Sequence, residues 1–166
     1  KVKDMVSNSK SLFHDETFAL NHPMSPHAAA ERDKVEISLG DFKIPETENH
    51  LIIEGAGGLM VPLNRKDCII DLIESLGVEV VLVSRNYLGS INHTLLSVQL
   101  LKQLNIPLLG IIFVGEENKS TEEAILKNTK VEVYHRIPIA KTLSKSFIYK
   151  EASILKKSFF SKIFNE

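Results

Sequence analysis

A single carboxylate followed at once by a glycine-rich turn is the feature of this sequence best suited to chemistry. Glu54 ends the apolar run 50–53. The next four residues are an alanine and three glycines: Gly55, Ala56, Gly57 and Gly58. Open α/β sheets bind ligands at the carboxyl ends of their strands, and a carboxylate suits a hard cation such as Mg²⁺. The pattern therefore predicts a ligand and cation site at Glu54, with a tight turn and a solvated glutamate as the alternative.

Two further segments place polar groups where helices are expected to begin. Ser25 precedes Pro26, which is typical of an N-cap followed by proline at the first helical position. Gly89 and Ser90 form a turn before a second helix, with Asn92 in its first helical turn. Helix amino termini receive anions, so both segments are candidate ligand sites. Ordinary capping is the alternative at each.

A third candidate lies after the last expected strand, where loops of parallel sheets often carry function. Pro138 and Ile139 follow Arg136 and Ile137 in a rigid turn whose apolar surface could line a flat ring. The alternative is an Ile-Pro pair that merely ends a strand.

Several other chemistries are excluded by spacing. The six histidines form no H-x-x-x-H or HExxH pair, and one cysteine, Cys68, makes neither an internal disulfide nor a structural zinc site. None of the eight glycines is followed by lysine. These 166 residues therefore contain no G-x-x-x-x-G-K-[ST] loop for nucleotide phosphates.

Strand-like and helix-like patterns alternate from residue 50 onward, which predicts a mostly parallel sheet. Apolar runs predict strands over 50–53, 79–84, 108–114 and 131–134. Helical spacing predicts helices over 69–76, 91–104, 121–127 and 146–164. Gly77 is expected to end the first of these helices, and Ser90 or Asn92 to cap the start of the second. A capping box of Ser120 and Glu123 is expected to open the third. Before residue 50 we expect a helix over 1–13, an extended piece over 17–20 and a short helix after Pro26.

Composition favours an ordinary globular domain. At 166 residues and 43% hydrophobic, the chain suits one α/β domain over residues 1–166. A net charge of -1 shows no basic footprint for nucleic acid, and no apolar run reaches the length of a membrane span. We therefore expect no nucleic-acid or membrane partner, and the cytoplasm as the compartment.

Three motifs, in this order and spacing, resemble dethiobiotin synthetase, the ATP-dependent ring-closing enzyme of biotin synthesis: PMSPHAAA, IIEGAGGLMVPL and VSRNYLGSINHTLLS. The resemblance covers essentially the whole chain. It implies a P-loop NTPase-like domain with helices on both faces of its sheet, acting as a homodimer. The implied reaction joins CO₂ or bicarbonate to the two amines of 7,8-diaminononanoate. ATP phosphorylates the resulting carbamate, which closes to a cyclic urea with loss of phosphate.

The resemblance also assigns roles to residues. It implies that Glu54 binds Mg²⁺. The implied nucleotide-binding set is Glu54, Gly55, Ala56, Gly57, Pro138 and Ile139. The implied substrate-binding set is Ser25, Leu88, Gly89, Ser90 and Asn92. Family members often carry an asparagine for the adenine ring where this chain has Val114, and Asn118 is a possible substitute.

The chain departs from the family pattern at its beginning. Family members open with a P-loop strand, a second strand with a catalytic lysine, and a further Mg²⁺-binding acid, and all of these would precede Lys1. We therefore expect a domain that lacks its first strands through amino-terminal truncation. We also expect no catalytic residue within this chain and no activity from it alone.

Two other functions compete with this interpretation. The first is a non-catalytic substrate-binding or dimerisation subunit of the same fold. The second is another P-loop amidoligase-like synthase with the same glycine turn, a different substrate and no role for Asn92.

Overall fold

The computed structural model describes residues 2–6 and 8–160 of the chain. These residues form two compact units. One comprises Lys1–Phe13 with Glu79–Glu166, and the other comprises His14–Val78. The expectation of a single domain over 1–166 stays a prediction.

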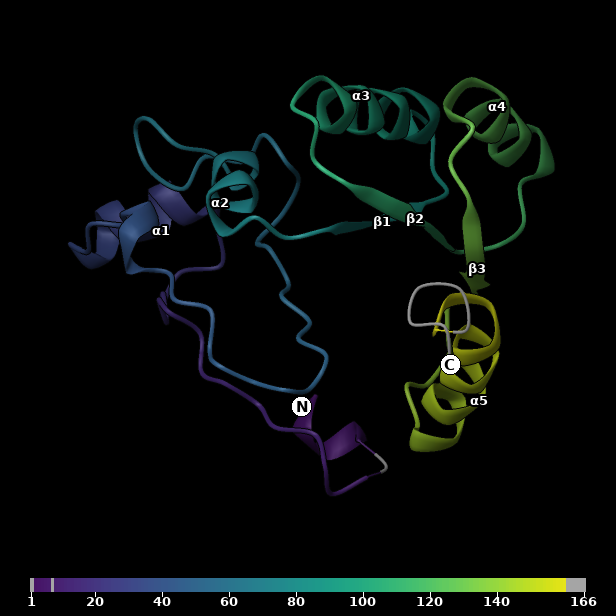
Figure 1. Cartoon of the computed structure of the whole chain (residues 1–166), viewed down its shortest axis with the longest axis horizontal. Helices are drawn as coiled ribbons and strands as arrows, with labels where there is room; N and C mark the ends of the chain where they lie inside the picture. The colour runs from purple at the N-terminus through teal and green to yellow at the C-terminus, as the bar shows by residue number, and fades with distance from the viewer. Residues whose placement is uncertain (1, 7, 161–166) are drawn as a thin grey trace. The chain divides into compact units, whose positions relative to one another are not determined.

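Three parallel strands form the sheet of the first unit, in the order β1 (Val80–Arg85), β2 (Leu108–Val114) and β3 (Val133–Ile137) (Figure 1). The helix α3 (Ser90–Gln103) connects β1 to β2, and α4 (Lys119–Thr129) connects β2 to β3. The last residues of the three strands are in register, since Arg85 pairs with Val114 and Val114 with Ile137. The loops that follow the strands therefore begin at one edge of the sheet.

The core of this unit lies between the sheet and the pair α3 and α4, which lie side by side in Figure 1. Its central buried side chains are Val98, Ile111, Phe113 and Ile125. On the other face, α5 (Lys145–Leu155) packs against β3, and the buried Glu151 carboxylate contacts Nε2 of His135 at 2.8 Å. Helices thus cover both faces of a parallel sheet, which confirms the predicted fold class.

The second unit contains two short helices, α1 (Pro26–Asp33) and α2 (Ile69–Leu76). A 3-10 turn, Leu39–Asp41, and one antiparallel bridge between Pro62 and Cys68 complete its regular structure within the described residues. Its core brings together side chains from both helices and the loops between them: Ala30, Ile37, Leu63, Ile69 and Leu72.

The predicted strand over 50–53 is wrong. No regular structure is assigned to these residues, and Ile52 is 87% exposed. A strand forms only when its backbone groups find a neighbouring strand, and within the described residues none pairs with this segment. An apolar run is therefore not sufficient to form a strand, because a neighbouring strand must also be present to pair with it.

Other differences concern element ends. The helix expected over 1–13 reduces to a 3-10 turn, Lys3–Met5, and residues 17–20 join no strand. The third strand of the sheet lies later than predicted, at Val133–Ile137. The last helix ends at Leu155 and continues as a π turn, Lys156–Phe160, while residues 161–164 of the predicted helix lie outside the described part of the chain.

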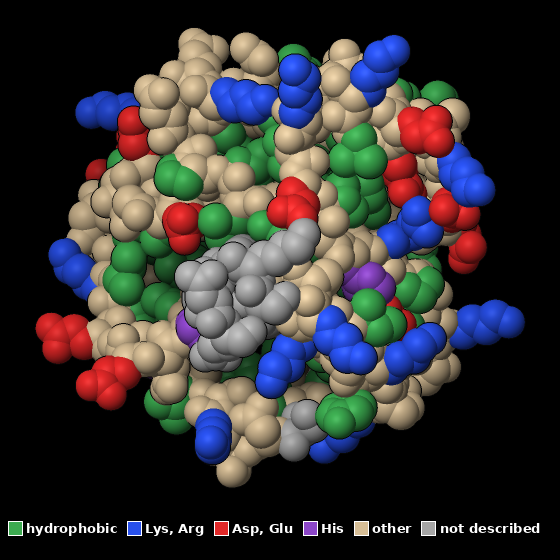
Figure 2. Space-filling model, turned by 45° about the vertical axis from the view of Figure 1, so that its right-hand side comes forward, with side chains coloured by type: hydrophobic (Ala, Val, Ile, Leu, Met, Phe, Trp, Pro, Cys, Tyr) green, Lys and Arg blue, Asp and Glu red, His purple; other side chains and the backbone are tan. Residues whose placement is uncertain are grey.

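On the face drawn in Figure 2, basic and acidic side chains both lie among hydrophobic and polar ones. Within the described residues, no helix combines the length and apolar character that crossing a bilayer requires.

Candidate functional site

The glycine turn is fastened to the beginning of α2. Two N–H groups of the first helical turn find acceptors in the preceding loop: Ile69 donates to Val61 O at 3.0 Å, and Ile70 donates to Leu59 O at 2.9 Å. Gly57 has φ +92°, and a Cβ there would lie 2.9 Å from Cγ2 of Val61. A side chain at Gly57 is therefore disfavoured twice, by backbone conformation and by space. This geometry holds the turn in one shape directly after Glu54.

The Glu54 side chain is exposed and free. Among residues 2–6 and 8–160, it makes neither a hydrogen bond nor an ion pair. Gly55, Ala56 and Gly57 are exposed as well, although a Cβ on Gly55 would come within 3.3 Å of Ile69. The carboxylate can therefore take a new partner without breaking an internal one.

Ser25 lies at the N-cap of α1, as predicted, but its hydroxyl makes no capping hydrogen bond. Its backbone carbonyl accepts instead, from the N–H groups of Ala28 and Ala29 at 3.0 Å each. The first turn of α1 contacts the loop that follows the glycine turn, because His27 N–H donates to Pro62 O at 3.3 Å. The structure thus brings the start of α1 and the loop after the glycine turn into one unit. Within the described residues, the Ser25 hydroxyl makes no hydrogen bond.

The start of α3 lies in the other unit. Gly89, with φ +102°, is the N-cap, so neither Ser90 nor Asn92 caps this helix. Leu88 and Asn92 are exposed, whereas Ser90 is 2% exposed and its Oγ has no partner in the described part of the chain. A small pocket of about 100 Å³ opens here; Ser90, Tyr87 and His93 contribute to its lining.

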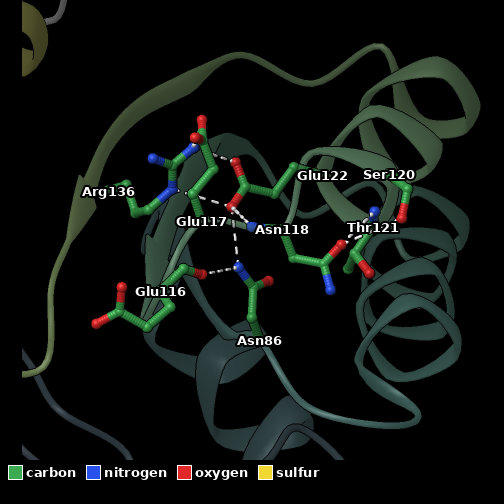
Figure 3. A network of polar contacts seen from close by, with 8 residues as sticks. All are labelled: Asn86, Glu116, Glu117, Asn118, Ser120, Thr121, Glu122 and Arg136. Carbon is green, nitrogen blue, oxygen red and sulfur yellow. Dashed lines mark hydrogen bonds and ion pairs between the residues drawn. The ribbon is translucent and has the colours of Figure 1, made fainter.

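A polar network at the carboxyl edge of the sheet was not foreseen from the sequence. We call it the Arg136 network; Figure 3 shows its members Asn86, Glu116, Glu117, Asn118, Glu122 and Arg136. Nε and Nη2 of Arg136 donate to the two carboxylate oxygens of Glu122 at 2.9 and 2.6 Å. The Asn86 amide donates to the same carboxylate at 2.9 Å. Strand β3, helix α4 and the loop after β1 are thereby joined.

Glu122 is ionised in this setting. Burial raises the pKa of its carboxyl group, but the hydrogen bonds from Arg136, Asn86 and the Asn118 N–H outweigh that effect and leave the pKa below its ordinary value. The hydrogen bond to Glu122 raises the pKa of Arg136 above its already high value. The pair therefore stays charged throughout the physiological pH range.

Relatives of known name resemble this chain along most of its length. The AAA domain family matches residues 1–146. ATP-dependent dethiobiotin synthetase of Christiangramia forsetii is 58% identical over 137 residues, covering 82% of this chain and 66% of that protein. The enzymes of the same name from Cytophaga hutchinsonii and Brucella ovis are 45% and 44% identical, covering 89% and 86% of this chain. The chain belongs to the dethiobiotin synthetase family.

The chain spans about two thirds of the length of these relatives, with 66%, 72% and 68% of them aligned. The family, the parallel P-loop NTPase-like fold and the ATP-dependent ligase class all agree with the resemblance drawn from the three motifs. That part of the sequence-based interpretation is confirmed.

The predicted site residues of this dethiobiotin synthetase family member fall into two sets. Ser25 and Glu54 to Gly57 lie in the unit His14–Val78. The remaining ones lie in the other unit: Leu88, Gly89, Ser90, Asn92, Pro138 and Ile139. Each set is formed locally, and their assembly into one site stays a prediction.

One sequence prediction at the edge of the sheet needs correction. Asn118, not Ser120, caps α4, because its Oδ1 accepts from Thr121 N–H at 3.1 Å. The same oxygen also accepts from the Ser120 hydroxyl at 3.1 Å, so the amide suggested as a substitute for adenine recognition already serves the helix. An asparagine directly before a helical run is itself a capping signal and could have been read from the sequence.

Proposed function

We propose that this chain supplies the metal-, nucleotide- and substrate-contacting loops of a cytoplasmic enzyme that makes dethiobiotin from 7,8-diaminononanoate, CO₂ and ATP. One observation carries the proposal: in a member of this family, a fixed glycine turn presents an exposed carboxylate that has no partner within the described residues. The whole protein's activity is proposed from the family, since this chain spans about two thirds of its relatives.

Mg²⁺ fits the chemistry of Glu54. Magnesium sites commonly use one or two protein carboxylates, with phosphate oxygens and waters as the other ligands. A free, exposed carboxylate beside a turn of small residues leaves room for such a shared shell. When bound, the ion neutralises charge on the phosphate oxygens, which is a large part of phosphoryl-transfer catalysis. Glu54 orients the ion, and the adjoining backbone permits close approach of the nucleotide.

Two loops of the sheet unit are suited to the nucleotide base and to the diamine. Ile139 follows Pro138 directly after β3 and is 53% exposed, so the pair offers a rigid apolar surface for a flat ring. At the start of α3, the unpaired Ser90 hydroxyl and the backbone after Gly89 offer donors for the carboxylate tail of the substrate. Ser25, with its uncommitted hydroxyl, is assigned to the substrate as well.

A homodimer is part of the proposal. Exposed apolar side chains gather at the end of β1 and the start of α3: Val83, Tyr87, Leu88 and Ile91. Such a group on the surface favours coverage by another molecule. A second copy of the chain would place its own substrate loop at the same interface.

The test uses the protein produced from its complete reading frame. Dethiobiotin formation is measured from the diamine, bicarbonate and ATP, with and without Mg²⁺. In Glu54→Gln we expect kcat to fall by about 10²- to 10³-fold, the usual cost of losing one group that stabilises transition-state charge. The melting temperature should change little, because Glu54 is exposed and makes no hydrogen bond or ion pair within the described residues.

The matched control is Glu48→Gln, which changes another exposed carboxylate of the same loop region. It should leave kcat unchanged. Absence of dethiobiotin from wild-type protein that still binds the diamine would overturn the proposal in favour of a non-catalytic subunit. Full Mg²⁺-dependent turnover in Glu54→Gln would remove Glu54 from the mechanism.

A further inference from the structure

The loops that follow β1 and β2 continue the backbone ladder of the sheet. Asn86 N–H donates to Val114 O at 3.1 Å, and Gly115 N–H donates to Ile137 O at 3.0 Å. The backbone is therefore ordered one residue beyond β1 and β2. After Ile137 the ladder ends, and Pro138 has no N–H to extend it. Side chains must hold the geometry from this point onward.

Arg136 is the charged side chain nearest to that point in sequence. Its guanidinium grips the Glu122 carboxylate with two hydrogen bonds, and Nη2 also donates to Glu117 Oε1 at 3.1 Å. The Glu122 side chain is only 10% exposed, whereas that of Glu117 is 50% exposed. A planar, two-point contact fixes the direction of the arginine, which a single point charge would not do.

Asn86 completes the arrangement from the β1 side. Its Nδ2 donates to Glu122 Oε1 and to the Glu116 carbonyl at 3.0 Å, so both acceptors fix the orientation of the amide. Its Oδ1 is left buried without a hydrogen-bond partner within the described residues. A buried acceptor without a donor costs free energy. The network thus maintains a fixed geometry at some cost to stability.

Glu122 is buried, whereas the Arg136 side chain is 32% exposed. Ion pairs with a buried member contribute little net stability compared with apolar residues of similar size, and their best-attested use is to specify geometry. The contact seen here joins Arg136, near the end of β3, to Glu117 in the loop 115–118. The Pro138–Ile139 turn begins after β3, and the loop 115–118 begins after β2. Both follow the strand ends at the sheet edge where ligands of α/β proteins bind.

We infer that Arg136 is a positioning residue for the nucleotide base: paired with Glu122, it holds the turn at Pro138 and Ile139 against the loop after β2. This inference rests on the proposed function, because the same turn is assigned there to the base. Arg136 does not contact the phosphates in this scheme. It acts through the two residues that follow Ile137.

The experiment measures steady-state kinetics of dethiobiotin formation by the complete protein and two variants. Arg136→Lys keeps the charge and removes the two-point contact, and Glu122→Gln keeps the shape of the acceptor and removes its charge. We expect KM for ATP to rise about tenfold in each, within the range of up to ~10²-fold that small misplacements produce. KM for the diamine should stay within about twofold, and the preference for ATP over GTP should decrease.

The control is Glu123→Gln, the neighbouring exposed carboxylate on α4, which belongs to no contact of the network. It should leave both KM values unchanged. KM does not depend on the fraction of folded enzyme, so a loss of folded protein in Arg136→Lys does not obscure the result. Glu122→Gln tests the same contact with a smaller change.

The outcomes separate the two proposals. Loss of kcat with both KM values unchanged in both variants would show a structural pair only and would overturn the inference. An equal rise in KM for ATP and for the diamine would also overturn it, since the effect would not belong to the base. Absence of dethiobiotin synthesis in the wild-type protein would instead contradict the proposed function itself.

Discussion

Glu54 and Glu122 differ in both exposure and hydrogen bonding. Glu54 lies in the open at a glycine turn and has no partner among the described residues. Glu122 is buried on α4 and accepts hydrogen bonds from Arg136, Asn86 and the backbone of Asn118. A free carboxylate can exchange water for a ligand, whereas a fully bonded one holds neighbouring loops in place. The contrast separates a group suited to chemistry from a group suited to positioning.

The largest expected effect on stability comes from breaking the buried pair. Arg136→Met leaves Glu122 buried without its cation, which typically costs about 3–5 kcal/mol. Glu54→Gln should change stability by less than about 0.5 kcal/mol, as exposed substitutions do. Urea unfolding of both variants measures the difference. Equal stability of the two variants would contradict the contrast between the carboxylates.

A smaller decrease in stability than that of Arg136→Met is expected when alanine replaces a glycine of β2, and little change when alanine replaces Gly58 of the glycine turn. In β2, a Cβ on Gly110 would overlap Cε2 of Tyr134, whose hydroxyl donates to Leu109 O at 2.7 Å. Gly110→Ala should therefore destabilise the protein by about 1–3 kcal/mol through overpacking.

Gly58→Ala is the matched control for Gly110→Ala. A Cβ there meets no atom within 4 Å, and the backbone does not adopt positive φ. Thermal unfolding of the two alanine variants should show a clear decrease in melting temperature only for Gly110→Ala. A similar decrease in both would mean that the tight contact with Tyr134 is not the cause.

The smallest expected effect is a dependence of stability on pH. The pKa of Glu122 lies below its ordinary value of 4.5 in the folded protein, so its bonds stabilise the fold fully above that value. This contribution is lost as the pH falls through the lowered folded pKa. The free energy of unfolding of wild type, relative to Glu122→Gln, should therefore decrease between pH 5 and more acidic values, by roughly the ~1.4 kcal/mol per pKa unit that linkage gives. A difference independent of pH would show that folding does not lower the pKa of Glu122.

Local patterns predicted several elements well. The strand Leu108–Val114 and the helix Ile69–Leu76, with Gly77 after it, lie where the apolar run and the helical spacing place them. Each is specified by a contiguous stretch whose pattern matches one secondary structure and ends at a clear signal. The short helix after Pro26 follows the same rule.

Other features could not be predicted from local pattern. The apolar run 50–53 resembles a buried strand, yet it remains exposed because pairing depends on a neighbour elsewhere in the chain. Glu122 resembles an ordinary solvated residue of a helix. Its burial follows only from the tertiary fold, which brings it to Arg136 in β3, fourteen positions later.

The sequence by itself determined the family, through three motifs, and the residue types at the candidate site, because these are properties of short segments. The tertiary structure alone decided which carboxylate is free and which is committed. The physical reason is that burial and hydrogen-bond partners depend on contacts between distant segments, and a glutamate acquires its role from the donors and solvent around it.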